Sequence, residues 1–392
     1  MRYRSLDSVR GIAAIIVVFY HAVLTIPGSF EDRLALRANG FDEKFAWLYL
    51  TPLRILVAGP AAVYLFFVLS GFVLTLSLGG GGRETYATFM LKRIVRIWLP
   101  FAVAILLSAL LANSLSHAPL RGTSEWMYLT WTDPVSFSLI CEHLLMLGTA
   151  ISLDNPMWSL IHEMRVSLIF PFLVFLAIKK PVVLIFMSLT CFSLSVFLQT
   201  HHNLSPIVFS YVTTLCYLPL FVIGILLALN RNIIFKYIAG LSISARTACW
   251  IFALIGLSYS PVVTSAVDRL NDGILLLING LAASVIIALT VSGNKVRHIL
   301  EKRPVLWLGK ISYSLYLVHV IVFAVLLRLM AGVPLLLLLP LCIAAALIVA
   351  AIFQRYVEQP AAAAGRLIAS RLNRPSYAQS EATVGNTHLV SD

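Results

Sequence analysis

The sequence predicts an all-α fold: a polytopic membrane bundle of about ten transmembrane helices plus one re-entrant or interfacial segment. Three observations lead to this prediction. Of the 392 residues, 60% are hydrophobic and only 12% are charged, whereas about a quarter of the residues of a soluble domain are charged. The mean hydropathy is +0.92. Apolar segments of about 20 residues, the length that crosses a bilayer as a helix, recur from end to end.

The apolar segments and the basic residues between them predict a topology. With ten spans, both ends of the chain lie on one side of the membrane. Of the 29 Lys and Arg residues, 21 then fall on the side of the termini and 8 on the other side. Because cytoplasmic loops are rich in Lys and Arg, we expect both termini to be cytoplasmic. The predicted spans are residues 11–27, 57–78, 97–115, 158–178, 181–199, 207–229, 247–264, 273–292, 311–330 and 333–353.

Two regions do not fit the pattern of spans. Residues 116–157 contain an apolar stretch, 136–151, that is too short and too polar to cross comfortably. A re-entrant or interfacial helix on the outer face suits this region better. From residue 361 the chain turns polar, so we expect a membrane domain over residues 1–360 and a disordered cytoplasmic tail over residues 361–392.

Charge and motif content argue against several classes of function. The net charge of +12 is explained by basic cytoplasmic loops, and no basic run is interleaved with aromatic residues. We therefore expect no nucleic acid partner. No zinc, P-loop or dinucleotide fingerprint is present. The five cysteines are scattered without a CxxC motif, so we expect no metal.

Polar residues inside the spans are the first candidates for function, because charge in lipid is costly and usually faces a bundle interior. Arg10 and His21 are eleven residues apart, which places them on one helix face roughly 16 Å apart. The alternative is a basic anchor at the membrane surface and a histidine that hydrogen-bonds to a neighbouring helix. This stretch by itself favours neither alternative.

The second span and the loop before the third span add three candidates. Ser70 precedes Gly71, and this pair of small residues is more readily explained by close helix packing than by function. Arg93 and Arg96 are three apart on a helix face and could form a fork for phosphate. Anchoring in lipid headgroups explains these two arginines equally well.

The fourth span opens with Trp158 and carries His162, Glu163 and Arg165 within about two turns. Ionisable side chains are expensive at the start of a span, which favours a functional role. Positions two apart do not face each other on a helix, so we expect Glu163 and Arg165 to have separate partners.

The ninth span carries a polar face. Spacings of four and three place Ser312, Tyr316 and His319 on the same side of a helix, with Tyr313 next to them in the sequence. A substrate-binding face and a hydrogen-bonded contact with another helix predict the same pattern.

Together these stretches resemble the acyltransferase-3 family of integral membrane acyltransferases. The matching motifs occur in family order and cover residues 5–360, nearly the whole chain. They are residues 6–14 with Tyr20 and His21, residues 66–72, residues 93–96, residues 158–160 with Glu163, residues 311–319 and residues 358–360.

The resemblance implies that an acyl donor, usually acetyl-CoA, enters from the cytoplasm. Its acyl group then passes across the membrane to a hydroxyl of a sugar or of another envelope or small-molecule acceptor. By the same resemblance, His21 is the catalytic histidine, and Arg10, Arg93 and Arg96 are needed for activity. The resemblance also implies that Glu163 is the acid of the fourth span.

Because CoA carries phosphates and is cytoplasmic, we expect Arg93 and Arg96 to bind the phosphates of the donor. Arg10 is too far along its helix to touch His21, so we expect it to position the donor or to pair with Asp7.

Two departures from the family pattern concern the fourth span. The family often has a pair of acids where this chain has Glu163 followed by Met164. His162 and Arg165 stand where many relatives have apolar or amide residues. We therefore expect a distinct subgroup with a different acceptor, and the assignment of Glu163 is the weaker one.

We predict an O-acyltransferase of a bacterial-type inner membrane, an O-acetyltransferase that uses acetyl-CoA to modify an envelope or exported saccharide. The alternative is a transporter for a small polar or anionic solute, since buried charges in a helical bundle also form permeation paths. A transporter predicts broken helices in paired halves, and no inverted repeat is visible in the sequence.

Overall fold

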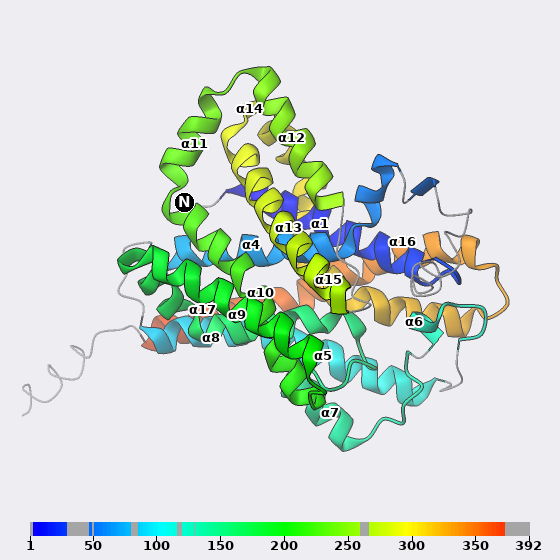
Figure 1. Cartoon of the computed structure of the whole chain (residues 1–392). Helices are drawn as coiled ribbons and strands as arrows, with labels where there is room; N and C mark the ends of the chain where they lie inside the picture. The colour runs from blue at the N-terminus through cyan, green and yellow to red at the C-terminus, as the bar shows by residue number, and fades with distance from the viewer. Residues whose placement is uncertain are drawn as a thin grey trace, which may run out of the picture.

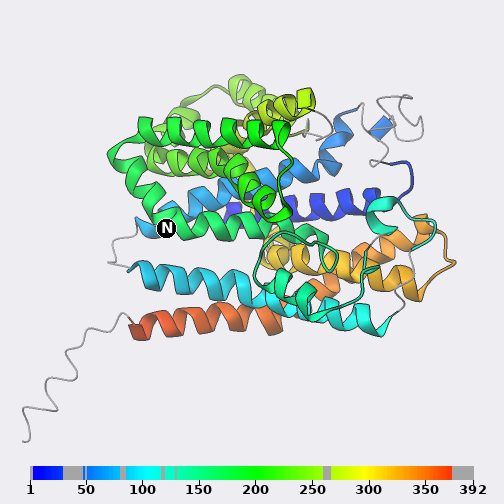
Figure 2. The same cartoon turned by 60° about the horizontal axis from the view of Figure 1, so that its bottom comes forward.

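The computed structural model describes residues 3–29, 47–48, 51–79, 85–115, 120–128, 130–258 and 266–372. Over these residues all regular secondary structure is helical, and there is no strand. Most of the long helices lie side by side along one direction (Figure 1 and Figure 2). The prediction of an all-α helical bundle is confirmed.

Nine of the described helices are long and apolar enough to cross a membrane. Large apolar side chains on their outer surface, such as Phe172 and Phe186, are 58% and 68% exposed. A surface of this kind is typical of contact with lipid. The nine helices are α1 (Arg4–Leu24), α4 (Gly59–Leu78), α5 (Tyr86–Ser114), α8 (Trp158–Lys179), α9 (Pro181–His201), α10 (Pro206–Leu229), α13 (Ala266–Ser292), α15 (Arg303–Leu329) and α16 (Leu335–Phe353).

The seventh predicted span, residues 247–264, is not among these nine. It corresponds to α12 (Ile243–Ser258), which has 16 residues, fewer than the about 20 that cross a bilayer. Residues 259–264 lie outside the described part of the chain. The other nine predicted spans each overlap one of the nine helices.

Four of the spanning helices begin seven or more residues earlier than predicted, and two of them are α13, which starts at Ala266 instead of residue 273, and α15, which starts at Arg303 instead of residue 311. The other two are α1 and α5, which start at Arg4 and Tyr86, where the apolar pattern places the starts at residues 11 and 97.

Arg93 and Arg96 therefore lie on a spanning helix, and the prediction that they belong to a loop is wrong. The run of apolar residues stops at the first charged residue, but the helix continues past it. The charged side chains are tolerated because Arg93 pairs with Glu163 and because Arg10 and Arg96 face a cavity inside the bundle.

No helix crosses the bundle within the described part of residues 116–157. The elements there are α6 (Glu125–Tyr128), α7 (Phe137–Leu144) and a 3-10 turn over Asn155–Met157. This agrees with the prediction that the region is not a simple span, while its position at the membrane surface stays a prediction. The fully buried indole of Trp131 donates to Ser108 Oγ at 2.9 Å and so joins the region to α5.

The C-terminal helix differs from the sequence prediction. α16 continues through a π-helical turn (Gln354–Glu358) into α17 (Gln359–Leu372). The disordered tail predicted from residue 361 is therefore wrong as far as Leu372, and residues 373–392 lie outside the described chain.

Small residues attach α17 to α5. Ala361, Gly365 and Ala369 are spaced by four and are all buried, and α17 packs against α5. Small side chains let two helix backbones approach closely. They contribute little hydropathy, which is why the composition of this segment suggested a tail.

Close contacts between the central helices also depend on glycines. A Cβ atom on Gly71 would collide with the backbone of Phe221, and one on Gly224 would collide with α4. α1 and α15 approach in the same way where Gly11 meets Gly309. The packing role expected of the Ser-Gly pair in the second span is confirmed for its glycine.

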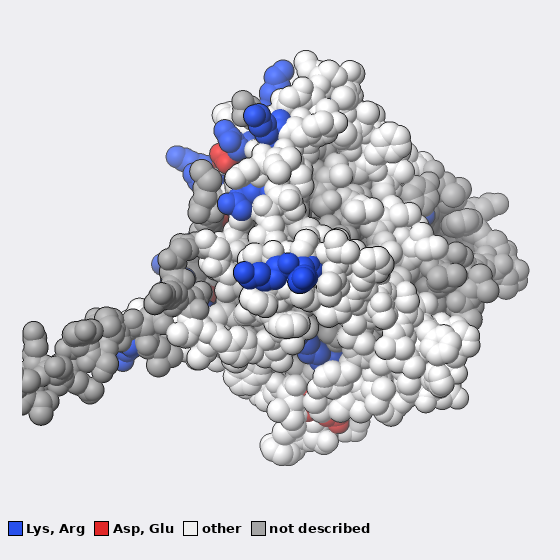
Figure 3. Space-filling model, turned by 60° about the vertical axis from the view of Figure 1, so that its left-hand side comes forward, with Lys and Arg blue, Asp and Glu red and all other residues white. Residues whose placement is uncertain are grey.

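Basic side chains collect at one end of the bundle. Figure 3 shows Lys and Arg gathered toward the end at which α1 begins, next to a broad white flank that carries few charges. Such an asymmetry is typical of a membrane protein whose cytoplasmic loops are basic.

Candidate active site

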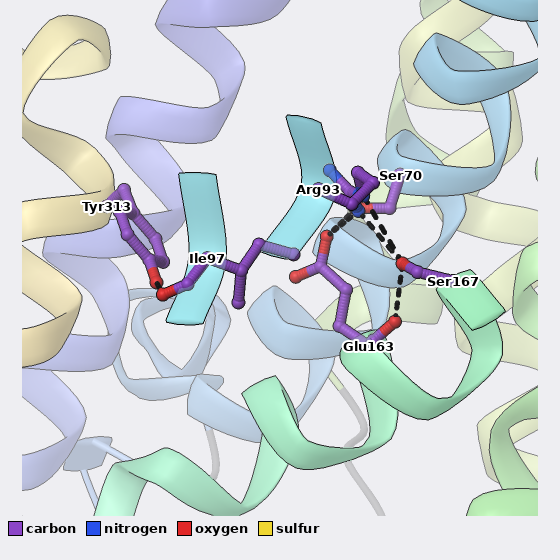
Figure 4. A network of polar contacts seen from close by, with 6 residues as sticks. All are labelled: Ser70, Arg93, Ile97, Glu163, Ser167 and Tyr313. Carbon is purple, nitrogen blue, oxygen red and sulfur yellow. Dashed lines mark hydrogen bonds and ion pairs between the residues drawn. The ribbon is translucent and has the colours of Figure 1, made fainter. Parts of the chain in front are cut away.

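A buried ion pair lies where α4, α5 and α8 meet (Figure 4). Nη2 of Arg93 is 2.8 Å from Oε1 of Glu163, and the two side chains are only 10% and 17% exposed. Ser70 Oγ donates to the same carboxylate oxygen at 2.7 Å. Nε and Nη2 of Arg93 donate to Ser167 Oγ at 3.3 and 3.2 Å. The pair is thus supported by a serine on each side, as burial of charge requires.

Arg93 and Arg96 do not have the same environment. Arg93 is buried and bound to Glu163, whereas Arg96, one turn further along α5, is exposed. Arg10 and Arg96 both line a cavity of about 100 Å³ beside the ion pair. Neither forms an ion pair with any residue in the described part of the chain. The charges of Arg10 and Arg96 are therefore not neutralised by an ion pair within the described part of the chain.

The same cavity is lined by residues from the second, fourth and ninth predicted spans. α4 contributes Phe66 and Ser70, α8 contributes Ser159 and Glu163, and α15 contributes Tyr316. The structure thus brings together candidates that lie far apart in the sequence.

Tyr313 and Trp158 pack beside this cavity. The hydroxyl of Tyr313 donates to the carbonyl oxygen of Ile97 at 2.7 Å. The ring of Trp158 lies 5.6 Å from that of Tyr217, centroid to centroid. Tyr313 also lines the cavity, whereas Trp158 is not among its lining residues.

A pair of histidines lies further along the bundle. Nδ1 of His21 is 2.7 Å from Nε2 of His319, and the planes of the two rings differ by only 9°. Both rings are buried. The indole of Trp126 stacks on His21 with ring centroids 4.8 Å apart. His21 therefore does hydrogen-bond to a neighbouring helix, as one of the two alternatives predicted. Its partner, His319, is itself a titratable group.

The hydrogen bonds determine which nitrogens carry protons. Nδ1 of His319 is 2.9 Å from the carbonyl oxygen of Leu315. A carbonyl only accepts, so Nδ1 of His319 carries the proton, and its Nε2 accepts from Nδ1 of His21. In the neutral pair, Nε2 of His21 is consequently unprotonated. That atom can take a proton or an acyl group.

Tyr316 lies between the cavity and the histidine pair. Its hydroxyl donates to the carbonyl oxygen of Pro156 and contacts Ser159 Oγ, both at 2.7 Å. Its ring lies 6.1 Å from that of His319, centroid to centroid. His21 and His319 are not among the residues that line the cavity. His21 is therefore buried outside the cavity that contains the arginines, and Tyr316 both lines that cavity and lies next to His319.

His162 and Arg165 point to the other side of α8, toward α10. Nη1 of Arg165 donates to the carbonyl and hydroxyl oxygens of Ser210 at 2.8 and 3.0 Å. Its Nη2 donates to the carbonyl oxygens of Met146 and Leu147. His162 Nδ1 lies 2.9 Å from Thr214 Oγ1. These contacts join α8 to α10 and to the chain after α7, and Glu163 and Arg165 have the separate partners that were expected.

The sequence did not single out Asp154 as a candidate. Its side chain is 1% exposed, and neither carboxylate oxygen has a hydrogen-bond partner among the described residues. Burial raises the pKa of this carboxyl well above its ordinary value. Its position, one residue before the 3-10 turn that contains Pro156, follows no pattern that could be detected without the fold.

Glu358 and Trp126 were also missed as site residues. The carboxylate of Glu358 accepts from Ser314 Oγ at 2.6 Å and lines the cavity. It belongs to a motif on which the family resemblance rests, so a signal was present in the sequence. Trp126 lies outside all motifs. Among the described residues, no group of three or more His, Cys, Asp or Glu side chains could hold a metal ion.

Comparison with known proteins identifies the family. A family model described as an acyltransferase domain matches residues 3–355. The acyltransferase MdmB of Streptomyces mycarofaciens is 32% identical over 130 residues, which are 33% of this chain and 32% of that relative. The match thus spans about a third of the relative's length. No solved structure matches the chain. Because the family model covers nearly all of the sequence, the chain belongs to this family of membrane acyltransferases.

Proposed function

We propose that this acyltransferase takes an acetyl group from cytoplasmic acetyl-CoA and transfers it to a hydroxyl of an envelope or exported saccharide. The observation that carries the proposal is the order of the arginine-lined cavity, Tyr316 and the histidine pair along the bundle. A cavity lined by Arg10, Arg93 and Arg96 leads to Tyr316, and beyond Tyr316 lies a histidine with an unprotonated Nε2. This arrangement suits a reaction that joins an anionic donor from one side to an acceptor from the other.

The donor side has the chemistry that CoA requires. The phosphates of CoA are anionic, and guanidinium groups bind phosphate through charge and paired hydrogen bonds. Arg10 and Arg96 supply these groups. Glu163 neutralises Arg93 and fixes its position, so we assign Glu163 to positioning. The role of catalytic acid, which the family resemblance implied, is the alternative that kinetics must decide.

The acceptor side has the chemistry of a general base. Nε2 of His21 takes the proton of the acceptor hydroxyl as the oxygen attacks the thioester carbonyl. The carbon–sulfur bond breaks, and the departing CoA thiolate takes up the proton, which restores neutral His21. His319 holds the tautomer throughout, as the orienting group of a catalytic triad does. If an acyl-imidazole forms instead, the same nitrogen of His21 carries the acyl group.

The proposed location is a bacterial-type inner membrane with both termini in the cytoplasm. The basic end at which α1 begins supports this orientation (Figure 3). The cavity that contains Arg10 and Arg96 then lies toward the cytoplasm, where acetyl-CoA is present. His21, near the far end of α1, lies toward the opposite side, where an exported saccharide would arrive.

The proposal is tested by transfer of label from radiolabelled acetyl-CoA to envelope saccharide in membranes. The His21→Gln variant removes the base, and His162→Gln removes another buried imidazole that contacts α10. At equal expression we expect His21→Gln to lose roughly 10²-fold or more of the activity and His162→Gln to retain most of it. Label in saccharide at equal rates in wild type and His21→Gln would refute the assigned chemistry.

A further inference from the structure

A second, wider cavity adjoins the arginine cavity at the end where α1 begins. Its volume is about 670 Å³. Both cavities are lined by Arg10, Val73, Arg96 and Glu358, so they adjoin, and we call the two together the passage. Part of the wall of the outer cavity is α17, the helix that the sequence assigned to a disordered tail.

The outer cavity adds two cations to those of the inner one. Lys92 lies one turn before Arg96 on α5, and Arg366 comes from α17. With Arg10 and Arg96, four cations line the passage, against the carboxylates of Asp7 and Glu358. The excess of positive charge favours an anionic ligand.

The position of Arg366 depends on the packing of α17. A Cβ atom on Gly365 would be 3.4 Å from the side chain of Val95 and 3.9 Å from the Cα atom of Lys92. The missing side chain therefore lets α17 lie directly against the turn of α5 that carries Lys92. Arg366 is the next residue, and both Arg366 and Lys92 line the outer cavity.

An aromatic side chain completes the lining. Tyr3, at the start of α1, lines the outer cavity. Its ring packs against Phe72 and Phe235, with centroid distances of 6.1 and 6.3 Å. These contacts hold the ring in place, and a fixed aromatic ring is a surface on which a base can stack.

We propose that the outer cavity binds the nucleotide end of the acyl-CoA donor, with Lys92 and Arg366 on the 3′-phosphate and Tyr3 on the adenine. This inference rests on the proposed function. The volume is within the range of small-molecule sites, and the smaller inner cavity, of about 100 Å³, is assigned to the thioester end of the donor. The phosphodiester of a lipid headgroup also binds cations, but it carries only one negative charge and has no base for Tyr3.

The first test compares two donors, acetyl-CoA and acetyl-3′-dephospho-CoA. In Arg366→Ala we expect the KM for acetyl-CoA to rise about tenfold, through loss of a charge-assisted contact, while kcat and the KM for the dephospho donor stay unchanged. Arg371→Ala, which removes an exposed arginine of the same helix outside the cavity, serves as the matched control. Equal effects of Arg366→Ala on both donors, or no effect on either, would overturn the proposal.

A binding measurement separates this inference from the proposed function. Adenosine 3′,5′-bisphosphate is titrated into the purified full chain in detergent, in wild type, Arg366→Ala and Arg371→Ala. Weaker binding in Arg366→Ala alone supports the subsite. Binding that is equal in all three proteins overturns the subsite and leaves the acyl-CoA donor intact, whereas no binding to wild type contradicts both. If Arg366→Ala lowers binding to phosphatidylglycerol vesicles and not to the nucleotide, lipid is the occupant and the subsite is wrong.

Discussion

Replacing Glu163 by glutamine removes the charge that Arg93 pairs with and changes the side chain's shape very little. The two side chains are 10% and 17% exposed and approach to 2.8 Å. Removing one partner of a buried ion pair typically costs about 3–5 kcal/mol, because the other charge is left uncompensated. Glutamine can still accept one hydrogen bond from Ser70 or from Arg93. We therefore expect a loss near the lower limit, about 3 kcal/mol.

The assay is equilibrium unfolding in detergent, with Glu142→Gln as the control. Glu142, in α7, bonds to the hydroxyls of Ser138 and Thr149 and has no arginine partner among the described residues, so we expect a loss of about 1 kcal/mol or less. Combining Arg93→Met with Glu163→Gln leaves no unpaired charge. The double variant should therefore be more stable than the sum of the two single losses predicts. Simple additivity would refute the inference that the two groups compensate each other.

Kinetics on the same variant separate two roles for the carboxylate. If Glu163 positions Arg93 for the donor, Glu163→Gln raises the KM for acetyl-CoA and leaves kcat nearly unchanged. If Glu163 is a catalytic acid, kcat falls by about 10²-fold or more. A fall in kcat with an unchanged KM would contradict the positioning role assigned above.

Three further predictions follow from the described contacts. His319→Ala removes the acceptor that fixes the tautomer of the catalytic imidazole, so kcat should fall by roughly 10²-fold. His319→Gln keeps an acceptor and should recover part of this loss in kcat. Equal kcat values of the two variants would contradict the tautomer argument. Gly71→Ala forces a methyl group into the backbone of α10 and should cost about 1–3 kcal/mol of stability, measured by thermal unfolding. In the control, Gly240→Ala, the added methyl group has no neighbour within 4 Å, so the loss of stability should be small. Similar losses in the two variants would argue against the close contact at Gly71. Asp154 has a raised pKa in the fold, so the folded state keeps a proton that the unfolded chain releases near pH 4. The contribution of Asp154 to the free energy of unfolding is fully present below about pH 4. It falls as the pH rises toward the folded pKa, by at most about 1.4 kcal/mol per pH unit. Between pH 5 and 7, the free energy of unfolding of Asp154→Asn should no longer show this dependence on pH. The control Asp133→Asn, which changes an exposed residue, should show the same dependence as wild type. Identical slopes of the free energy of unfolding against pH in the two variants would refute the prediction.

Hydropathy and charge along the chain were sufficient for the fold class and for most spans. Nine of the helices predicted to cross the membrane are present, because burial in lipid requires a run of apolar residues that is local in sequence. Polar groups inside such runs were detectable for the same reason. His21, Glu163 and His319 stand out because an ionisable side chain in an apolar run is costly unless it has a partner or a task.

Helix ends and polar partners were decided by the tertiary structure. α5 extends through Arg93 because Glu163, 70 residues later, neutralises it, and α17 forms because small residues fit against α5. His21 meets His319 across 298 residues. A local pattern shows that a polar group needs a partner, but identifying that partner requires knowing which helix faces meet. Helix packing sets those faces, and with them the hydrogen bond that fixes the protonation of His21 and the cavity that Tyr316 and the arginines line.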